Sequence, residues 1–223
     1  DMIMDYEGNY WLSSSRMGVL LLSRSKFSDF NLLSGMEDAM VNAVYRYKGN
    51  TYVGSDDGLS VFNYRYEKVT DYATVELTDM LSGISVRHIM SDKEGSLWIS
   101  TYRKYGVVKV ERDGTISNFG RNSGLPSNTV YFTYELSDGT IAVSMDAGLL
   151  IIDKQGEILQ TYGVEQGISE RILSVFEDED GTIYLGTDGS GIYLISAEDK
   201  SILAHYDTES GLNSDVVTVI TKG

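Results

Sequence analysis

Three sets of glycines recur through this chain at one shared period, and that period constrains the fold more than any other feature. The first set precedes alternating apolar runs, with members 41 to 46 residues apart: Gly8, Gly49, Gly95, Gly139, Gly181 and Gly223. The second set follows those runs, at Gly18, Gly58, Gly106, Gly148 and Gly191, and the third precedes an apolar residue, at Gly35, Gly83, Gly124, Gly167 and Gly211. Repeats of roughly 40–45 residues built of β-strands are typical of propeller blades.

Each repeat predicts four short strands, from an innermost to an outermost one. The innermost strands are expected at 41–47, 86–91, 129–136, 172–177 and 216–221, and the second strands at 10–14, 51–55, 97–101, 141–145 and 183–187. The third strands are expected at 19–23, 59–63, 107–111, 149–153 and 192–196, and the outermost strands end on Phe30, Tyr72, Phe119, Tyr162 and Tyr206. Glycines in the hairpin turns supply the positive φ that tight turns require. No helix is expected.

The predicted fold class is therefore all-β: a β-propeller of five four-stranded blades with one extra innermost strand. The blades run over 1–35, 36–83, 84–124, 125–167 and 168–211, and residues 212–223 begin a sixth. One blade cannot bury both of its faces, so the copies must stack. The aromatic residues expected to pack between blades are Trp11, Tyr52, Trp98 and Tyr184. Ala142 takes that position in the fourth blade, where a local compensation is expected.

Composition excludes several classes of partner. The 223 residues carry a net charge of −15, whereas surfaces that bind nucleic acid or anionic membranes are basic. The sequence has no cysteine, which excludes disulfides, thiolate metal sites and cysteine nucleophiles. Its longest apolar runs are about five residues, such as "GLLII" at 148–152, so no segment of this chain is expected to insert in a membrane.

The pattern D-x-x-G-x-[WY]-[LIV]-[GS]-[TS]-x-x-G-[LIV], followed by an aromatic residue and G-L-x-x-[ND], resembles the two-component regulator propeller repeat. It stands here as "DYEGNYWLSSSRMGV" (5–19), "DKEGSLWISTYRKYGV" (92–107) and "DEDGTIYLGTDGSGI" (178–192). The linkers "SGLPSN" (123–128) and "SGLNSD" (210–215) complete it. Two copies depart from the pattern: "YKGNTYVGSDDGL" lacks the first Asp, and "SDGTIAVSMDAGL" lacks both that Asp and the aromatic residue.

The resemblance implies a sensor. Such propellers form the extracytoplasmic input region of bacterial membrane receptors, periplasmic or extracellular, and the output is a histidine kinase or diguanylate cyclase beyond a transmembrane helix. Family propellers are often seven-bladed. The start of the chain, "DMIMDYEG" (1–8), is also an innermost strand and its turn, which makes six with the five given above. Six do not fit a closed ring of five blades, so we expect the chain to be part of a larger propeller, seven-bladed by resemblance. Its open edges would invite pairing with another chain, so self-association is also expected.

No catalytic site, metal site or cofactor is predicted. His88 and His205 fall in different blades, and no serine sits in a G-x-S-x-G elbow. "FEDEDG" (176–181) lacks the regularly spaced ligands and closing glutamate of a calcium loop. "GTDGSG" (186–191) leads into a strand, without the helix N-terminus that holds a phosphate. His88, beside the axis, is open to two interpretations, a ligand contact or a structural histidine.

A basic aromatic loop interrupts this acidic chain. "YRKY" (102–105) lies in the third loop between second and third strands, where Trp98 and Gly106 are 8 positions apart, against 6 from Tyr52 to Gly58. These loops share one face of a propeller with the linkers between blades, and loops on a rigid scaffold commonly carry binding. Arg and Tyr suit carboxylates, sulfates and sugar rings. The predicted ligand-binding residues are Arg16, Tyr102, Arg103, Lys104, Tyr105, Arg121, Asn122 and Arg171.

The sequence therefore predicts a ligand-sensing propeller that acts by binding and not by catalysis, on a small molecule or saccharide with an anionic or sugar group. The charged loops have a simpler interpretation, which is that they are only solvated. Two rival functions also stay open. A scaffold for protein–protein contact would show an apolar patch on the face or rim, and a propeller-fold lyase would bring histidine and acidic residues together on one face.

Overall fold

The computed structural model describes residues 2–4, 10–14, 18–22, 30–36, 39–146, 148–196 and 198–221. The chain divides into two compact units, Asp1–Asp38 and Ala39–Gly223. The first unit holds one antiparallel sheet of β1 (Met2–Met4), β2 (Tyr10–Ser14) and β3 (Gly18–Leu22), and helix α1 (Phe30–Ser34). The predicted strands near 10–14 and 19–23 are confirmed. Phe30, however, begins a helix and does not end a strand.

Three sheets of the second unit are antiparallel meanders of four strands each, in chain order from one edge to the other. We call them the third, fourth and fifth blades. The third consists of β7 (Val86–Ser91), β8 (Leu97–Thr101), β9 (Val107–Val110) and β10 (Ile116–Phe119). The fourth consists of β11 (Val130–Glu135), β12 (Ile141–Met145), β13 (Leu149–Ile152) and β14 (Ile158–Tyr162). The fifth consists of β15 (Ile172–Glu177), β16 (Ile183–Thr187), β17 (Ile192–Ile195) and β18 (Ile202–Tyr206).

The second blade departs from this plan. Its sheet contains β4 (Val41–Tyr47), β5 (Asn50–Ser55) and β6 (Gly58–Phe62). The outermost strand expected to end on Tyr72 is reduced to one isolated bridge, between Lys68 and Phe62, and helix α2 (Tyr72–Met80) follows it. Asp71 caps α2 by accepting a hydrogen bond from the Thr74 backbone N–H at 3.1 Å. Leu77 and Leu81, four residues apart, are both buried. The expectation of no helix was therefore wrong.

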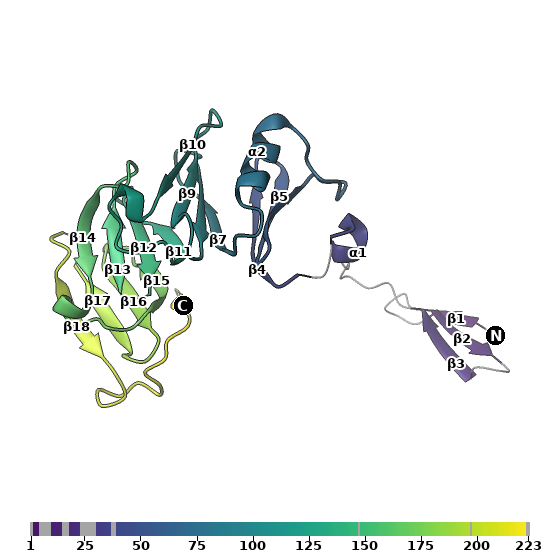
Figure 1. The fold of residues 1–223 in the computed structure, drawn as a ribbon. Helices are drawn as coiled ribbons and strands as arrows, with labels where there is room; N and C mark the ends of the chain where they lie inside the picture. The colour runs from purple at the N-terminus through teal and green to yellow at the C-terminus, as the bar shows by residue number, and fades with distance from the viewer. Residues whose placement is uncertain are drawn as a thin grey trace. The chain divides into compact units, whose positions relative to one another are not determined.

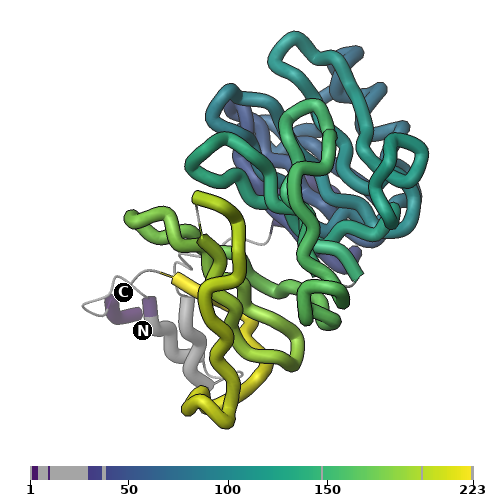
Figure 2. The backbone as a smooth tube through the Cα atoms, turned by 90° about the vertical axis from the view of Figure 1, so that its left-hand side faces the viewer, coloured from purple at the N-terminus to yellow at the C-terminus, as the bar shows by residue number. Residues whose placement is uncertain are grey.

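Two 3₁₀ turns, η1 (Arg121–Ser123) and η2 (Val164–Gln166), lie in the linkers after the third and fourth blades. Within the second unit, the sheets follow one another in chain order, as the colours of Figures 1 and 2 show. Strand β7 lies against β4 on one side and β11 on the other, and β12 contacts β15, so the first strands of neighbouring sheets are the innermost ones. This arrangement confirms the predicted all-β propeller class.

Aromatic side chains fill the space between blades as predicted. Trp98 of the third blade is completely buried and belongs to one cluster with Ile141 and Val143 of the fourth. Its indole stacks on Phe119, with ring centroids 5.8 Å apart. Tyr52 is buried in the cluster between the second and third blades. Each contact removes a large apolar surface from water, which is what holds adjacent blades together.

The other positions of this aromatic set behave differently. Ala142 is fully buried, and Tyr162 of the same blade lies in its cluster and donates a hydrogen bond of 2.7 Å to the Lys200 carbonyl of the fifth blade. Tyr184 is half-buried, with its ring 6.1 Å from that of Phe176. The side chain of Trp11 lies outside the described residues.

The innermost strand expected at 216–221 is not present. Within the part of the chain that is described, this segment makes one isolated bridge, between Asp188 and Val216, and Val217 N donates to the Thr187 carbonyl at 2.9 Å. An innermost strand is defined by its ladder with a following strand, and no described residue supplies that ladder. The segment therefore docks on the end of β16 without forming a strand.

Candidate functional site

Every innermost strand of the second unit bulges at the same place, one residue after it begins. The ladder register shifts between Val41 and Ala43 in β4, and the equivalent shifts occur in β7, β11 and β15. A bulge leaves one residue unpaired and turns its side chain in a new direction. The bulged residues are Asn42, Arg87, Tyr131 and Leu173.

The loops between second and third strands close onto the segments that precede the innermost strands. Tyr102 N donates to the Ser85 carbonyl at 2.9 Å, and Asp188 N donates to the Arg171 carbonyl at 3.0 Å. Asp56 N makes the same contact to the carbonyl of Met40 at 3.1 Å. We call this surface the loop face. These repeated bonds fix the loop residues beside the bulges, so polar side chains from several blades meet there.

Arginine and tyrosine side chains form a continuous row across three blades of the loop face. The rings of Tyr102 and Tyr131 lie 6.2 Å apart, tilted by 59°. The guanidinium carbons of Arg87 and Arg103 lie 4.9 Å and 4.7 Å from the centroid of Tyr102, and that of Arg171 lies 4.6 Å from Tyr131. Such stacking holds cations over aromatic faces. We call these five residues the Arg–Tyr row.

Three aspartates hold the row in place. Asp146 accepts a hydrogen bond of 3.0 Å from the Tyr131 phenol, and Asp188 accepts one of 2.6 Å from Arg171. Asp56 lies 3.7 Å from Arg87. Hydrogen bonds from Asn42 and Ser85 lower the pKa of Asp56, and Arg87 lowers it further. Each carboxylate follows the second strand of its blade, and this position places Asp56 beside the bulged Arg87 and Asp146 beside the bulged Tyr131.

The row keeps donors that the protein does not use. The Nε atoms of Arg87 and Arg171 are buried, and neither has a hydrogen-bond partner among the described residues. Burial and the bond to Asp146 raise the pKa of Tyr131, which keeps its phenol protonated. Arg103 has a positive φ of 75°, an uncommon conformation for a residue with a side chain that is often found at functional positions. A buried donor without an acceptor costs free energy that a ligand oxygen would recover.

An apolar cavity of about 300 Å³ borders the row. Buried Met145, Leu149 and Leu150 form part of its wall, and Pro126 and Ser127 of the linker form another part. Asp146 belongs to both features, because it lines this cavity and accepts the hydrogen bond of Tyr131. The loop face therefore offers a cationic aromatic row next to an apolar hollow, a combination that suits a ligand with one polar and one apolar end.

The structure brings together some of the residues predicted for ligand binding. Tyr102, Arg103 and Arg171 belong to the Arg–Tyr row. Lys104 lies exposed on the same loop, with its ammonium 5.0 Å from the centroid of the Tyr105 ring. Tyr105 itself packs against the apolar cluster between the second and third blades, so it serves the core more than the surface.

The remaining predicted residues do not join the row. Arg121 holds the linker together: its Nε donates to the Pro126 carbonyl at 3.1 Å, and its backbone N–H donates to Asn128 Oδ1 at 2.7 Å. Asn122 lies exposed in η1. Arg16 lies outside the described residues.

Sequence reasoning missed Arg87, Tyr131 and the three aspartates. A signal was present, because Asn42, Arg87 and Tyr131 each follow the first apolar residue of an innermost strand. Asp56, Tyr102, Asp146 and Asp188 likewise each follow a second strand. Both positions recur once in every blade, but only the bulge and the closed loop show that they meet.

The two histidines stay apart. Burial lowers the pKa of His88 to about 4, and its Nδ1 accepts a long hydrogen bond of 3.5 Å from the Thr133 backbone N–H. His205 is exposed on β18 and stacks on Tyr193, with ring centroids 4.2 Å apart. Within the described part of the chain, no group of three or more His, Asp or Glu residues is arranged to hold a metal ion. No helix of the described residues has the length and apolar character needed to cross a membrane.

Residues 80–103 and 166–189 match the two component regulator propeller family. No curated protein matches the chain in sequence. Virginiamycin B lyase from Staphylococcus aureus is similar in structure, with a TM-score of 0.56 and 12% identity over 90% of this chain and 67% of the lyase, a likeness that concerns the fold alone.

Two further structures are extracellular domains of proteins assigned as hybrid two component systems from B. thetaiotaomicron. The BT3049 domain has a TM-score of 0.69 and 21% identity, and the alignment covers 97% of this chain and 29% of the BT3049 chain. The BT4673 domain has a TM-score of 0.63 and 20% identity, and the alignment covers 90% of this chain and 30% of the BT4673 chain. This chain thus spans less than a third of the length of either. The family match and the packed blades agree with the sequence pattern: residues 80–103 and 166–189 each match a two component regulator propeller repeat, and both segments lie in the propeller-like second unit.

Proposed function

We propose that this chain is a ligand-sensing, extracytoplasmic propeller domain of a bacterial transmembrane signalling receptor. It acts by binding a small molecule or saccharide that carries a carboxylate or sulfate, and not by catalysis. The Arg–Tyr row carries this proposal, because its two buried Nε donors lack partners among the described residues. The extracellular domains that share its fold support the location and the receptor role.

The chemistry of the row selects the ligand class. Arginine guanidiniums present planar donors that match carboxylate and sulfate oxygens, and tyrosine rings offer flat faces for a sugar ring. Asp146 and Asp188 hold Tyr131 and Arg171 in fixed positions, so little side-chain entropy is lost when a ligand binds. The bound ligand changes the output only through its differential affinity for two receptor states.

Calorimetric titration with D-glucuronate tests the proposal, since this probe combines a sugar ring with a carboxylate. We expect saturable binding that weakens about tenfold or more in Arg171→Ala, because one charge-assisted contact is lost. D-glucose, which lacks the carboxylate, should bind more weakly. Arg65→Ala is the matched control, because Arg65 also lies over a tyrosine ring, 5.3 Å from Tyr64, but stands outside the row. Equal affinity in Arg171→Ala and Arg65→Ala would contradict the proposal.

A further inference from the structure

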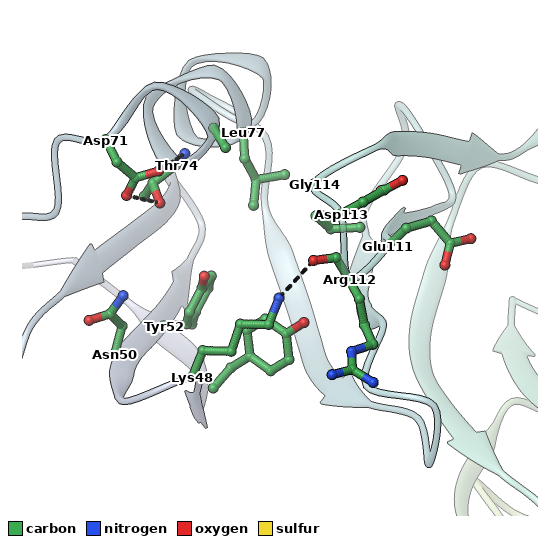
Figure 3. Close-up of a pocket in the computed structure, with 13 residues that line it drawn as sticks. Lys48, Asn50, Tyr52, Asp71, Thr74, Leu77, Glu111, Arg112, Asp113 and Gly114 are labelled. Carbon is green, nitrogen blue, oxygen red and sulfur yellow. Dashed lines mark hydrogen bonds between the residues drawn. The ribbon is translucent and has the colours of Figure 1, made fainter.

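The second blade has a cavity at the opposite end of its strands from the loop face. In the third to fifth blades, an outermost strand pairs with the third strand of the sheet. In the second blade, this pairing is reduced to one bridge between Lys68 and Phe62, and α2 packs beside β6 as well. A cavity of about 300 Å³ lies between α2, the β4–β5 hairpin and the turn at 111–114 of the next blade (Figure 3). We call it the rim cavity, and its volume is at the lower end for small-molecule sites.

Tyr52 brings an unused polar atom to this cavity. The residue is only 8% exposed, and its ring packs edge-on against Tyr47 with centroids 5.8 Å apart. Its phenol makes no hydrogen bond with any described residue, although it lines the cavity. Burial raises the pKa of Tyr52, and Tyr47 and Asp71 raise it further, so the phenol remains a donor. A buried tyrosine hydroxyl usually has a partner, and here the cavity is where one would lie.

Lys48 brings a positive charge to the same cavity. Its ammonium donates a hydrogen bond of 3.1 Å to the Arg112 carbonyl and lies 5.0 Å from the centroid of Tyr47, which fixes its position (Figure 3). Among the described residues it has no ion pair. An ammonium has three donors, so two remain available to a ligand.

The carboxylates around the cavity are already engaged. Asp71 accepts from the Thr74 backbone N–H and hydroxyl, at 3.1 Å and 2.7 Å. Glu111 pairs with Lys109 at 2.6 Å, and Asp113 accepts from the Thr115 backbone N–H at 2.9 Å. Lys48 and Tyr52 therefore supply donors that no described carboxylate engages, and buried Leu77 adds an apolar wall.

We propose that the rim cavity binds a small organic carboxylate with a compact apolar body. The carboxylate contacts the ammonium of Lys48 and the phenol of Tyr52, and the apolar body packs against Leu77 and Val110. Such a site would be independent of the loop face, because the two lie at opposite ends of the strands. Among the described sheets of the second unit, the second blade alone has a helix of this length after its strands, and α2 forms one wall of the cavity.

Benzoate is the probe, titrated against the whole chain by ligand-observed NMR. We expect saturable binding that weakens about tenfold in Lys48→Met, where the charge is lost, and about threefold in Tyr52→Phe, where one donor is lost. Benzamide, which has the same ring without the charge, should bind about tenfold more weakly than benzoate. Ala73→Phe, on the exposed first turn of α2, should block binding without changing any charge.

Lys93→Met is the matched control. Lys93 occupies the equivalent hairpin of the third blade, and its ammonium also donates to backbone carbonyls, at 3.4 Å to Leu136 and 3.3 Å to Ser137. It does not line the cavity, so benzoate affinity should be unchanged. The proposal is overturned if benzoate shows no saturable binding, if Lys48→Met and Ala73→Phe bind as the wild type does, or if Lys93→Met loses as much affinity as Lys48→Met. Melting temperatures identify any variant that fails to fold. If a variant fails, the difference in affinity between benzoate and benzamide for the wild-type chain tests the proposal instead.

Discussion

The indole Nε1 of Trp98 donates a hydrogen bond of 2.9 Å to Oδ2 of Asp92. The other carboxylate oxygen of Asp92 accepts from the Ser96 backbone N–H at 2.8 Å and so closes the hairpin turn. The two residues are the Asp and the Trp of the repeat pattern. Their spacing lets one buried carboxylate shape the turn and satisfy the only polar atom of the indole. These two hydrogen bonds explain why the repeat pattern carries an Asp six positions before its Trp.

Replacing Trp98 tests this packing. Trp98→Ala should lower the free energy of unfolding by about 3–5 kcal/mol, because a fully buried indole between two blades leaves a cavity. Asp92→Ala should cost about 1–3 kcal/mol by leaving the indole N–H without its acceptor. Urea unfolding measures both. Tyr72→Ala is the control, since Tyr72 is 84% exposed. A cost below about 1 kcal/mol for Trp98→Ala would contradict the interblade position.

The third loop separates binding residues from packing residues. Arg103→Ala and Lys104→Ala should leave the melting temperature nearly unchanged, because both side chains are exposed. Tyr105→Ala should lower it, because Tyr105 packs on the cluster between the second and third blades. Differential scanning calorimetry distinguishes the three variants. Equal stability of all three would mean that Tyr105 does not support the core.

The second glycine of each repeat should not tolerate a side chain. Gly148 has a φ of 92°, and a Cβ there would overlap the carbonyl oxygen of Tyr162. A Cβ at Gly106 would likewise overlap the carbonyl oxygen of Phe119, and one at Gly191 would overlap that of Tyr206. Gly148→Ala should therefore cost at least about 2 kcal/mol of stability. Gly139→Ala is the control, because its φ is similar at 83° but its Cβ would meet only Lys154 Cε at 4.0 Å. Equal losses would show that overlap with the carbonyl does not matter.

Protonation of His88 should destabilise the fold. Its pKa is lowered from 6.5 to about 4 by burial, so the unfolded chain binds a proton at a higher pH than the folded chain. Stability should then fall as the pH drops from about 6.5 to about 4, by up to roughly 3 kcal/mol. His88→Gln should remove this component, measured as the difference between two urea-unfolding series. An unchanged pH dependence in His88→Gln would place the titration on other groups.

The glycine period predicted the blades and most of their strands, because tight turns leave a strong local signal. It did not predict α2. The aromatic residue Tyr72 fitted the pattern of an outermost strand, while the cap at Asp71 and the pair Leu77 and Leu81 went unrecognised. At 216–221 a strand was predicted and is not formed. The alternation of apolar residues fits a strand, but a strand also needs a paired neighbour along its length.

The candidate site was predicted only in part, for a geometric reason. The composition of "YRKY" indicated the loop, and Tyr102 and Arg103 do join the row. Arg87 and Tyr131 lie inside strands, where alternation alone assigns them no exposed role. The bulges turn them toward the loop face, and a bulge has no clear signature in a single sequence.

The Nε–Hε resonances of the arginines test the central claim most directly, because the Arg–Tyr row is proposed to bind through them. In a ¹⁵N-labelled sample titrated with D-glucuronate, the signals of Arg87 and Arg171 should shift together and saturate at one affinity, since their Nε atoms have no partner among the described residues. The signal of Arg65, which lies over Tyr64 outside the row, should stay in place. Unmoved Arg87 and Arg171 signals, or shifts equal to that of Arg65, would contradict ligand binding at the loop face.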